Sequence, residues 1–148
     1  MSPASRPSPS DLARFAEAVA ALAVAGAVIR FLPFRLVIQL MGGADPAPTR
    51  PAFAESVQIA IRRASRRVPW KTVCFQEGLA AHWMLRRRGQ PSRLHYGIRN
   101  ADDRLTAHVW VTLRGEIVVG EEHPATRHLP VAVYPLQAGA GRPTDRPI

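Results

Sequence analysis

The hydrophobic positions of this chain change their period along its length. Between residues 11 and 89, apolar side chains recur every three or four positions, as in amphipathic helices. After residue 91 they alternate with polar side chains, as in strands that have one buried face. The clearest alternation comes from Leu105, Ala107, Val109, Val111 and Leu113. Helices first and strands second predict an α+β fold, with N-terminal helices followed by a small antiparallel sheet.

The first predicted helix begins at an Asp11 N-cap and runs to about Phe31. Its centre, residues 18–29, is an unbroken run of twelve small and apolar residues. Because about 20 residues are needed to span a bilayer, we expect this helix to pack on the domain or to lie on a membrane surface. A secretory signal begins with a positively charged region, so the acidic Asp11 and Glu17 argue against one here.

Three further helical segments are predicted before the strands begin. A short apolar segment covers residues 34–41, and an amphipathic helix covers residues 52–67. The next helix begins near Cys74 with Thr72 as its N-cap and ends at Gly89.

These elements divide the chain into four predicted parts. Residues 1–10 form a disordered tail, and residues 11–51 form an apolar helical segment with a proline-rich linker. Residues 52–135 form the principal domain, and residues 136–148 form a flexible tail.

Composition narrows the class of protein. The chain is 47% hydrophobic and 21% charged, which indicates a globular domain. Its single cysteine excludes an internal disulfide and favours a reducing, cytoplasmic location. The net charge of +9 is almost wholly arginine, which is compatible with nucleic acid, an anionic membrane or an acidic partner. We expect no nucleic acid, because no recognisable nucleic-acid motif accompanies the arginines.

Cys74 is the candidate nucleophile. It lies in the first turn of a predicted helix, three residues after the basic Lys71. Both the helix dipole and a nearby cation stabilise a thiolate. A lone cysteine in a helix is more often an inert core residue, so the interpretation depends on a partner. His108 is that candidate partner, on the strand face that also carries Trp110 and Thr112.

A third residue follows from the predicted hairpin. If Arg114 and Gly115 form a two-residue turn, the antiparallel register places Glu121 opposite His108, with their Cβ atoms about 5 Å apart. A carboxylate there would orient the imidazole and stabilise its positive form. A three-residue turn would give this role to Glu122 instead.

An ordered set of motifs resembles the B proteins of lasso-peptide biosynthesis. The motifs are Pro69-Trp70-Lys71-Thr72-Val73-Cys74-Phe75-Gln76, Leu79-Ala80-Ala81, Arg86-Arg87-Arg88-Gly89, Tyr96-Gly97-Ile98 and Ala107-His108-Val109-Trp110-Val111. The likeness covers about residues 52–122, and Phe75 and Val109 replace the leucine and alanine that are common in the family. The resemblance implies a transglutaminase-like, papain-related cysteine peptidase domain.

The resemblance also implies a function. The chain would cleave a ribosomally made precursor, with Cys74, His108 and Glu121 as its catalytic residues, and would bind no cofactor or metal itself. The released core peptide would pass to a partner cyclase that resembles asparagine synthetase and uses ATP. The expected partners further include a separate leader-binding recognition element, because the N-terminal segment has no room for that domain. Peripheral contact with a membrane is also expected.

Two other functions stay open at this point. A transglutaminase-like acyltransferase would use the same residues and transfer the acyl group to an amine. A non-catalytic basic binding protein would instead rest on the arginines at residues 62–67 and 86–88.

Overall fold

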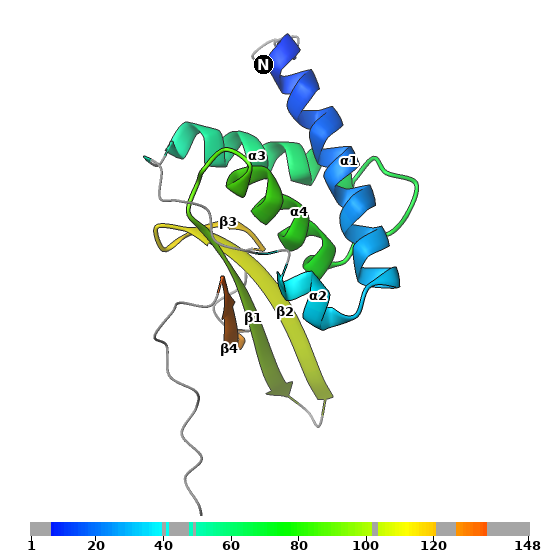
Figure 1. Ribbon diagram of the computed structural model, residues 1–148, viewed down its shortest axis with the longest axis vertical. Coiled ribbons are helices and arrows are strands. Elements are labelled where there is room, and N and C mark those ends of the chain that lie inside the picture. Colours follow the sequence, from blue (N-terminus) through cyan, green and yellow to red (C-terminus); the bar gives the residue numbers. More distant parts are fainter. Residues whose placement is uncertain are drawn as a thin grey trace, which may run out of the picture.

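Helices precede strands along the chain, as the change of period predicts. The computed structural model describes residues 7–39, 41, 48, 50–101, 104–120 and 127–135. Its elements are α1 (Pro9–Phe31), α2 (Phe34–Gln39), α3 (Pro51–Ser65), α4 (Cys74–Arg86), β1 (Ser92–Ala101), β2 (Arg104–Leu113), β3 (Glu116–Val119) and β4 (Leu129–Tyr134). The strands form one antiparallel sheet in the order β3-β2-β1-β4, with the helices on one side of it (Figure 1). This arrangement confirms the α+β prediction.

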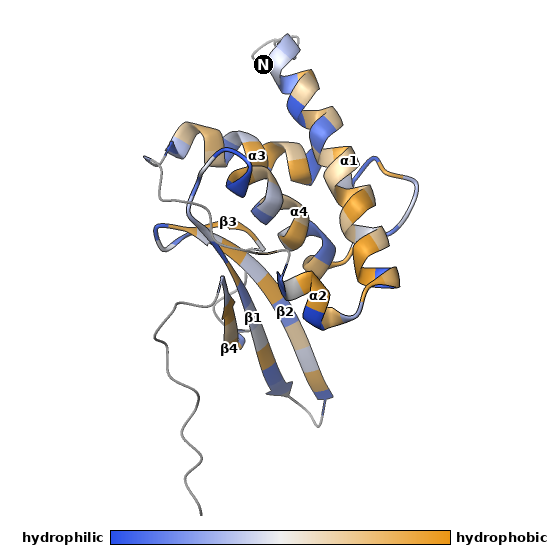
Figure 2. Ribbon diagram, viewed as in Figure 1, coloured by the Kyte–Doolittle hydropathy of each residue, from blue (hydrophilic) through white to orange (hydrophobic). Residues whose placement is uncertain are grey.

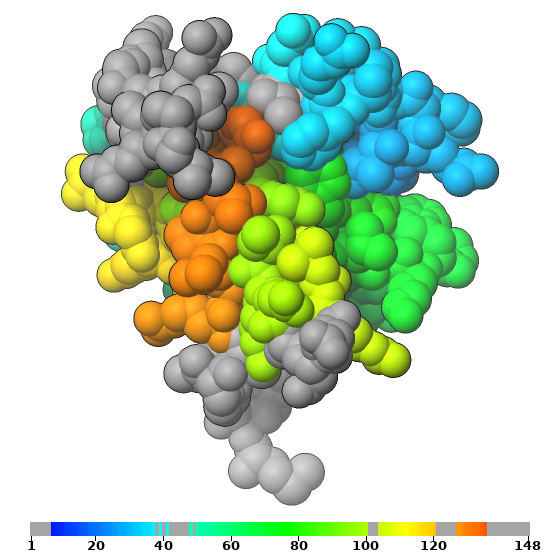
Figure 3. All heavy atoms as spheres, turned by 90° about the horizontal axis from the view of Figure 1, so that it is seen from below, coloured from blue at the N-terminus to red at the C-terminus, as the bar shows by residue number. Residues whose placement is uncertain are grey.

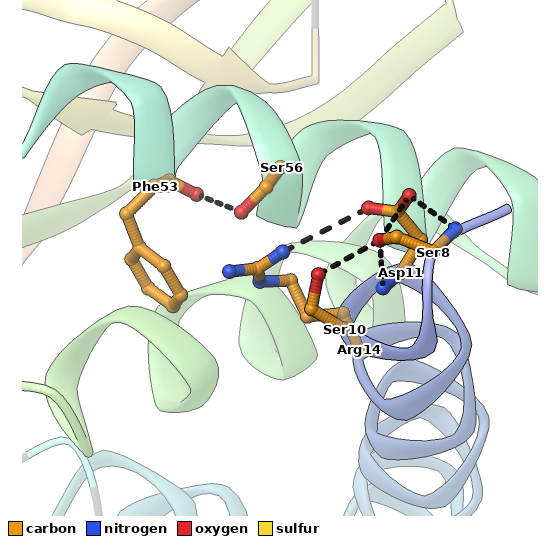
Figure 4. Close-up of polar contacts among 6 residues, drawn as sticks. All are labelled: Ser8, Ser10, Asp11, Arg14, Phe53 and Ser56. Carbon is orange, nitrogen blue, oxygen red and sulfur yellow. Dashed lines mark hydrogen bonds and ion pairs between the residues drawn. The ribbon is translucent and has the colours of Figure 1, made fainter.

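The N-cap of α1 is Ser8, three residues before the predicted Asp11. The Asp11 N–H donates to Ser8 Oγ at 3.2 Å, and the Ser8 N–H donates to Asp11 Oδ2 at 3.1 Å, which is a capping box (Figure 4). Pro9 occupies the first helical turn, where its missing N–H costs nothing. With 23 residues, α1 is long and apolar enough to cross a membrane by length and composition alone.

In the structure, α1 packs against α3 and α4. Its buried stripe is Ala18, Leu22 and Ala25, all fully inaccessible to solvent. The side-chain amide of Gln76 on α4 donates to the Leu22 carbonyl oxygen at 2.8 Å. Gly26 permits this approach, since a Cβ there would lie 2.8 Å from Gln76 Nε2. The apolar N-terminal segment therefore contributes to the same core as the later helices.

Side chains alternate between the two faces of β1 and β2, but burial does not follow the alternation throughout: Leu105, on the face predicted to be buried, is 71% exposed, and Thr112, on the other face, is 7% exposed. Leu94, Val109 and Val111 are buried on the face that packs against α4. Gly78 on α4 allows the close contact, because a Cβ there would lie 2.7 Å from Val109 Cγ1. Figure 2 shows the resulting change between hydrophobic and polar positions along β2, and Figure 3 shows β4, in orange, lying beside β1.

The β2–β3 hairpin has the predicted two-residue turn. Arg114 and Gly115 have φ angles of 53° and 86°, as a type I′ turn requires, and Leu113 pairs with Glu116. The predicted register does not continue, however. Thr112 pairs with Ile117, but Val111 pairs with Val119, so a bulge shifts the register by one residue.

Candidate active site

Cys74 is exposed at the first residue of α4. The N-cap is Val73, whose side chain cannot accept a hydrogen bond. Thr72 does not cap the helix as predicted, because its hydroxyl donates instead to the Glu77 carboxylate. Within the described ranges, the N-cap of this helix therefore makes no side-chain hydrogen bond. The positive end of the α4 dipole is left at the sulfur.

His108 lies on β2 and is half-buried. Its Nε2 is 3.0 Å from the Gly120 carbonyl oxygen. A carbonyl oxygen can only accept, so Nε2 must donate and therefore carries the proton of the neutral ring. Nδ1 is then the unprotonated nitrogen, and it is the atom that can act as a base.

Gly120 holds its carbonyl in this position through a close backbone contact. Its φ is 87°, and a Cβ at this residue would lie 2.5 Å from the Val109 carbonyl oxygen and 2.8 Å from Trp110 Cα. Only glycine fits both conditions. Sequence reasoning missed this role of Gly120; the signal available was a glycine that directly follows the apolar residues 117–119 at the end of a strand.

Cys74 and His108 line the same pocket, which has a volume of about 320 Å³. Its other lining residues are Gln58, Ile61, Arg62, Ser65, Glu77, Val118, Val119 and Gly120. The fold thus brings together the predicted nucleophile and base from α4 and β2. Among the residues that the structure describes, these two side chains make no hydrogen bond to each other, and such catalytic contacts commonly tighten only when substrate binds.

A stack of rings fixes the plane of the His108 imidazole. The Trp110 ring is stacked on His95 at 5.2 Å between centroids and on His108 at 6.1 Å. The His128 ring is tilted relative to the His108 ring, with 5.4 Å between their centroids. Gly97 leaves room for the indole, because a Cβ there would lie 2.7 Å from Trp110 Cζ3. The base is therefore held by its neighbours on the sheet.

His95 forms the outer end of this stack. Its Nε2 lies 2.8 Å from the Thr112 hydroxyl. Burial lowers the pKa of His95, and the positive charge of Arg93 lowers it further. The ring that packs on Trp110 is therefore kept neutral around neutral pH.

The predicted third residue, Glu121, lies outside the described residues, as does its alternative Glu122. The register from which Glu121 was deduced does not hold beyond the bulge, so the pairing argument no longer selects between the two. The acceptor found at His108 Nε2 is the Gly120 carbonyl. The role of Glu121 stays a prediction.

The described ranges contain no group of three or more His, Cys, Asp or Glu side chains that could hold a metal ion.

Comparison with known proteins gives one family. The model of the transglutaminase-like superfamily matches residues 18–133, which include most of α1 as well as Cys74 and His108. No curated protein and no solved structure gives a significant match. Since the match covers most of the chain and agrees with the α+β architecture, this chain belongs to the transglutaminase-like superfamily.

Proposed function

We propose that this protein is a cysteine peptidase in which Cys74 is the nucleophile and His108 the general base. One observation carries the proposal: a cysteine at an uncapped helix N-terminus shares a pocket with a histidine whose Nε2 is bound to a carbonyl oxygen. In that arrangement Nδ1 of His108 can act as the base, and the positive end of the α4 dipole stabilises the thiolate of Cys74.

The chemistry runs in two steps. His108 Nδ1 takes the proton from Cys74 Sγ, and the thiolate attacks the carbonyl carbon of the substrate peptide. The Cys74 N–H is the candidate donor to the developing oxyanion. The imidazolium returns its proton to the departing amine, which leaves a thioester. Water, deprotonated by Nδ1, then attacks the thioester and releases the acid and the thiol.

The Gly120 carbonyl supports both steps. It accepts from Nε2 whether the ring is neutral or positive, so this hydrogen bond persists while Nδ1 gains and loses its proton. Glu121 remains the proposed acid, acting together with this carbonyl. Glu121→Gln and Glu122→Gln, compared separately, would distinguish the two carboxylates.

The substrate we propose is a ribosomally made lasso-peptide precursor, from which the enzyme removes the leader. The ordered motifs around Cys74 and His108 support this assignment. The proposed partners are the precursor, a separate leader-binding protein and an ATP-using cyclase that resembles asparagine synthetase. The reaction needs no cofactor on this chain, and the proposed location is the cytoplasm, with peripheral membrane contact through the apolar α1.

The exposed arginines near the end of α3 offer a docking face for an acidic leader or for the leader-binding protein. Arg63, Arg66 and Arg67 are exposed there, and Arg62 lines the active-site pocket. A partner that tethers the leader would raise its effective concentration at Cys74 to about the millimolar range. Charge on this face would act mainly on the rate of encounter.

The test is cleavage of a candidate lasso-peptide precursor, followed by mass spectrometry. Cys74→Ala should abolish cleavage, because no other thiol can form the thioester, and the melting temperature should stay unchanged at this exposed site. A free acid as product identifies a peptidase, and a new amide identifies the alternative acyltransferase. Near-normal turnover by Cys74→Ala would exclude both.

A further inference from the structure

A second pocket, of about 540 Å³, lies between the first half of α3 and the β2–β3 hairpin. Its lining includes Ala52 and Glu55 from α3 and Ile117 from β3. Gln58 and Val118 line this pocket and the active-site pocket alike. The two pockets therefore adjoin each other along β3, and we call them together the groove; Cys74 and His108 line its active-site end.

One edge of β3 has no strand partner within the described part of the chain. The strand order places β3 at the end of the sheet, and no other strand of the described chain pairs with its outer side. In a hairpin with a two-residue turn, the pair that flanks the turn is hydrogen-bonded and the next pair is not. Ile117 belongs to that next pair, so its N–H and C=O point away from β2.

We propose that the substrate segment on the amino-terminal side of the scissile bond binds in this groove as an added strand on β3. The proposal rests on the peptidase function above and names how that site holds its substrate. Main-chain hydrogen bonds to an exposed edge are a common way to bind an extended peptide. The groove fits such a segment because α3 covers one face of the added strand while β3 supplies the edge.

Length and continuity support this occupant. The four residues of β3 span about 13 Å, enough for about four residues of an extended peptide. Beyond β3, Gly120 turns the chain back against β2 beside His108, so a strand that follows β3 arrives at the nucleophile. The amino-terminal segment of the substrate is the part that stays bonded to Cys74 in the thioester. Contacts to it therefore persist through both chemical steps.

Two chloromethyl ketones test the proposal, because each alkylates a histidine-activated cysteine. One is acetyl-Ala-Ala-Val-Ala chloromethyl ketone, which reaches along the groove, and the other is acetyl-Ala chloromethyl ketone, which does not. The longer probe should alkylate Cys74 at least about tenfold faster in the wild-type protein, since the Ile117 N–H and C=O can each bond to its backbone. Mass spectrometry locates the label.

Variants of the groove make the test specific. Ile117→Pro removes the outward N–H but no bond to β2, and should slow the longer probe about two- to tenfold, while Ile117→Val should not. Ala52→Trp fills the groove from an exposed helix position and should bring the longer probe close to the rate of the shorter one, while Ala52→Ser should not. The shorter probe should react equally with all four variants.

A third measurement needs no variant. Longer probes N-methylated at one residue at a time should lose rate at alternate positions, because alternate amides of a strand face its neighbour. The proposal is overturned if the longer probe reacts no faster than the shorter one, or if neither Ala52→Trp nor N-methylation slows it. If the shorter probe labels the His108→Ala variant as fast as the wild type, the peptidase assignment fails and this proposal fails with it.

Discussion

The two faces of β2 differ in chemistry although they alternate residue by residue. Val109 and Val111 lie on the α4 face and are almost completely buried. His108 and Trp110, their immediate neighbours, lie on the other face in a half-buried stack of rings. The first face contributes apolar burial and hence stability, and the second holds the base in one orientation. Adjacent residues of β2 therefore contribute separately, one to stability and the next to the orientation of the base. Single substitutions can distinguish the two contributions.

Substituting one residue on each face of β2 should give the largest effects on activity and on stability. His108→Ala removes the base, and we expect it to lower kcat at least about a thousandfold, because base and nucleophile act as a unit. The free energy of unfolding should change little. Val109→Ala should instead cost about 2 kcal/mol of stability through the cavity that it leaves, while kcat stays near the wild-type value. Urea unfolding and steady-state kinetics on both variants measure the two properties.

An outcome in which His108→Ala and Val109→Ala lose activity equally would remove the distinction between the faces. The same variants in an assay with acetyl-Ala chloromethyl ketone separate loss of the base from loss of substrate binding. A drop in labelling for His108→Ala alone is the expected result.

Much of this separation could be predicted from the sequence, because it depends on local periodicity. The alternation from Leu105 to Leu113 predicts which side chains share a face, and the Arg114-Gly115 pair predicts the turn. The start of α4 at Cys74 was also predicted. These features follow from side-chain period and from the φ angles that a turn requires.

The sequence predictions that were wrong concern positions where a single local contact decides the geometry. The bulge after Ile117 shifts the register by one residue, and nothing in the alternation of β3 marks it. The Gly120 carbonyl takes the position at His108 Nε2 because the chain approaches β2 at a distance that only glycine allows. The N-terminal caps of α1 and α4 were assigned to the wrong residues, since several hydroxyl and carboxylate side chains compete at each helix start.

Another histidine, His82 on α4, sharpens the comparison because, unlike His108, it is fully buried. It is fully buried, and its Nδ1 lies 3.0 Å from the Ser92 hydroxyl. Burial lowers its pKa from 6.5 to about 4, and the charge of Arg86 adds to the effect. The unfolded chain therefore binds a proton between pH 6.5 and 4 that the folded protein excludes.

The contribution of His82 to the free energy of unfolding is thus fully present above pH 6.5 and is lost as the pH falls toward 4. The expected loss is about 3 kcal/mol, from the size of the pKa change. Urea unfolding of the wild type and of His82→Asn at intervals from pH 4 to 7 measures it, because the difference between the two curves removes the carboxylates that titrate in the same range. Parallel curves would contradict the buried, neutral state of His82.

The smallest expected effect concerns the contact between α4 and β2. A methyl group at Gly78 would lie 2.7 Å from Val109 Cγ1, so the buried Val109 side chain or α4 would have to shift. Overpacking of this kind costs about 1–3 kcal/mol, against which alanine gains about 1 kcal/mol over glycine in a helix interior. Gly78→Ala should therefore lower the free energy of unfolding by about 1 kcal/mol and leave the His108 face intact.

Val109→Ala supplies the matched background, because it removes the methyl group that the new side chain meets. In that background Gly78→Ala should be neutral or stabilising by up to about 1 kcal/mol, since only the helix preference remains. A double-mutant cycle by urea unfolding measures the coupling. Equal costs in both backgrounds would show that Gly78 does not limit the approach of α4 to the sheet. Unchanged labelling of Cys74 in all three variants would confirm that this contact acts on stability, whereas a loss confined to Gly78→Ala would mean that the spacing of α4 and β2 also sets the position of the nucleophile.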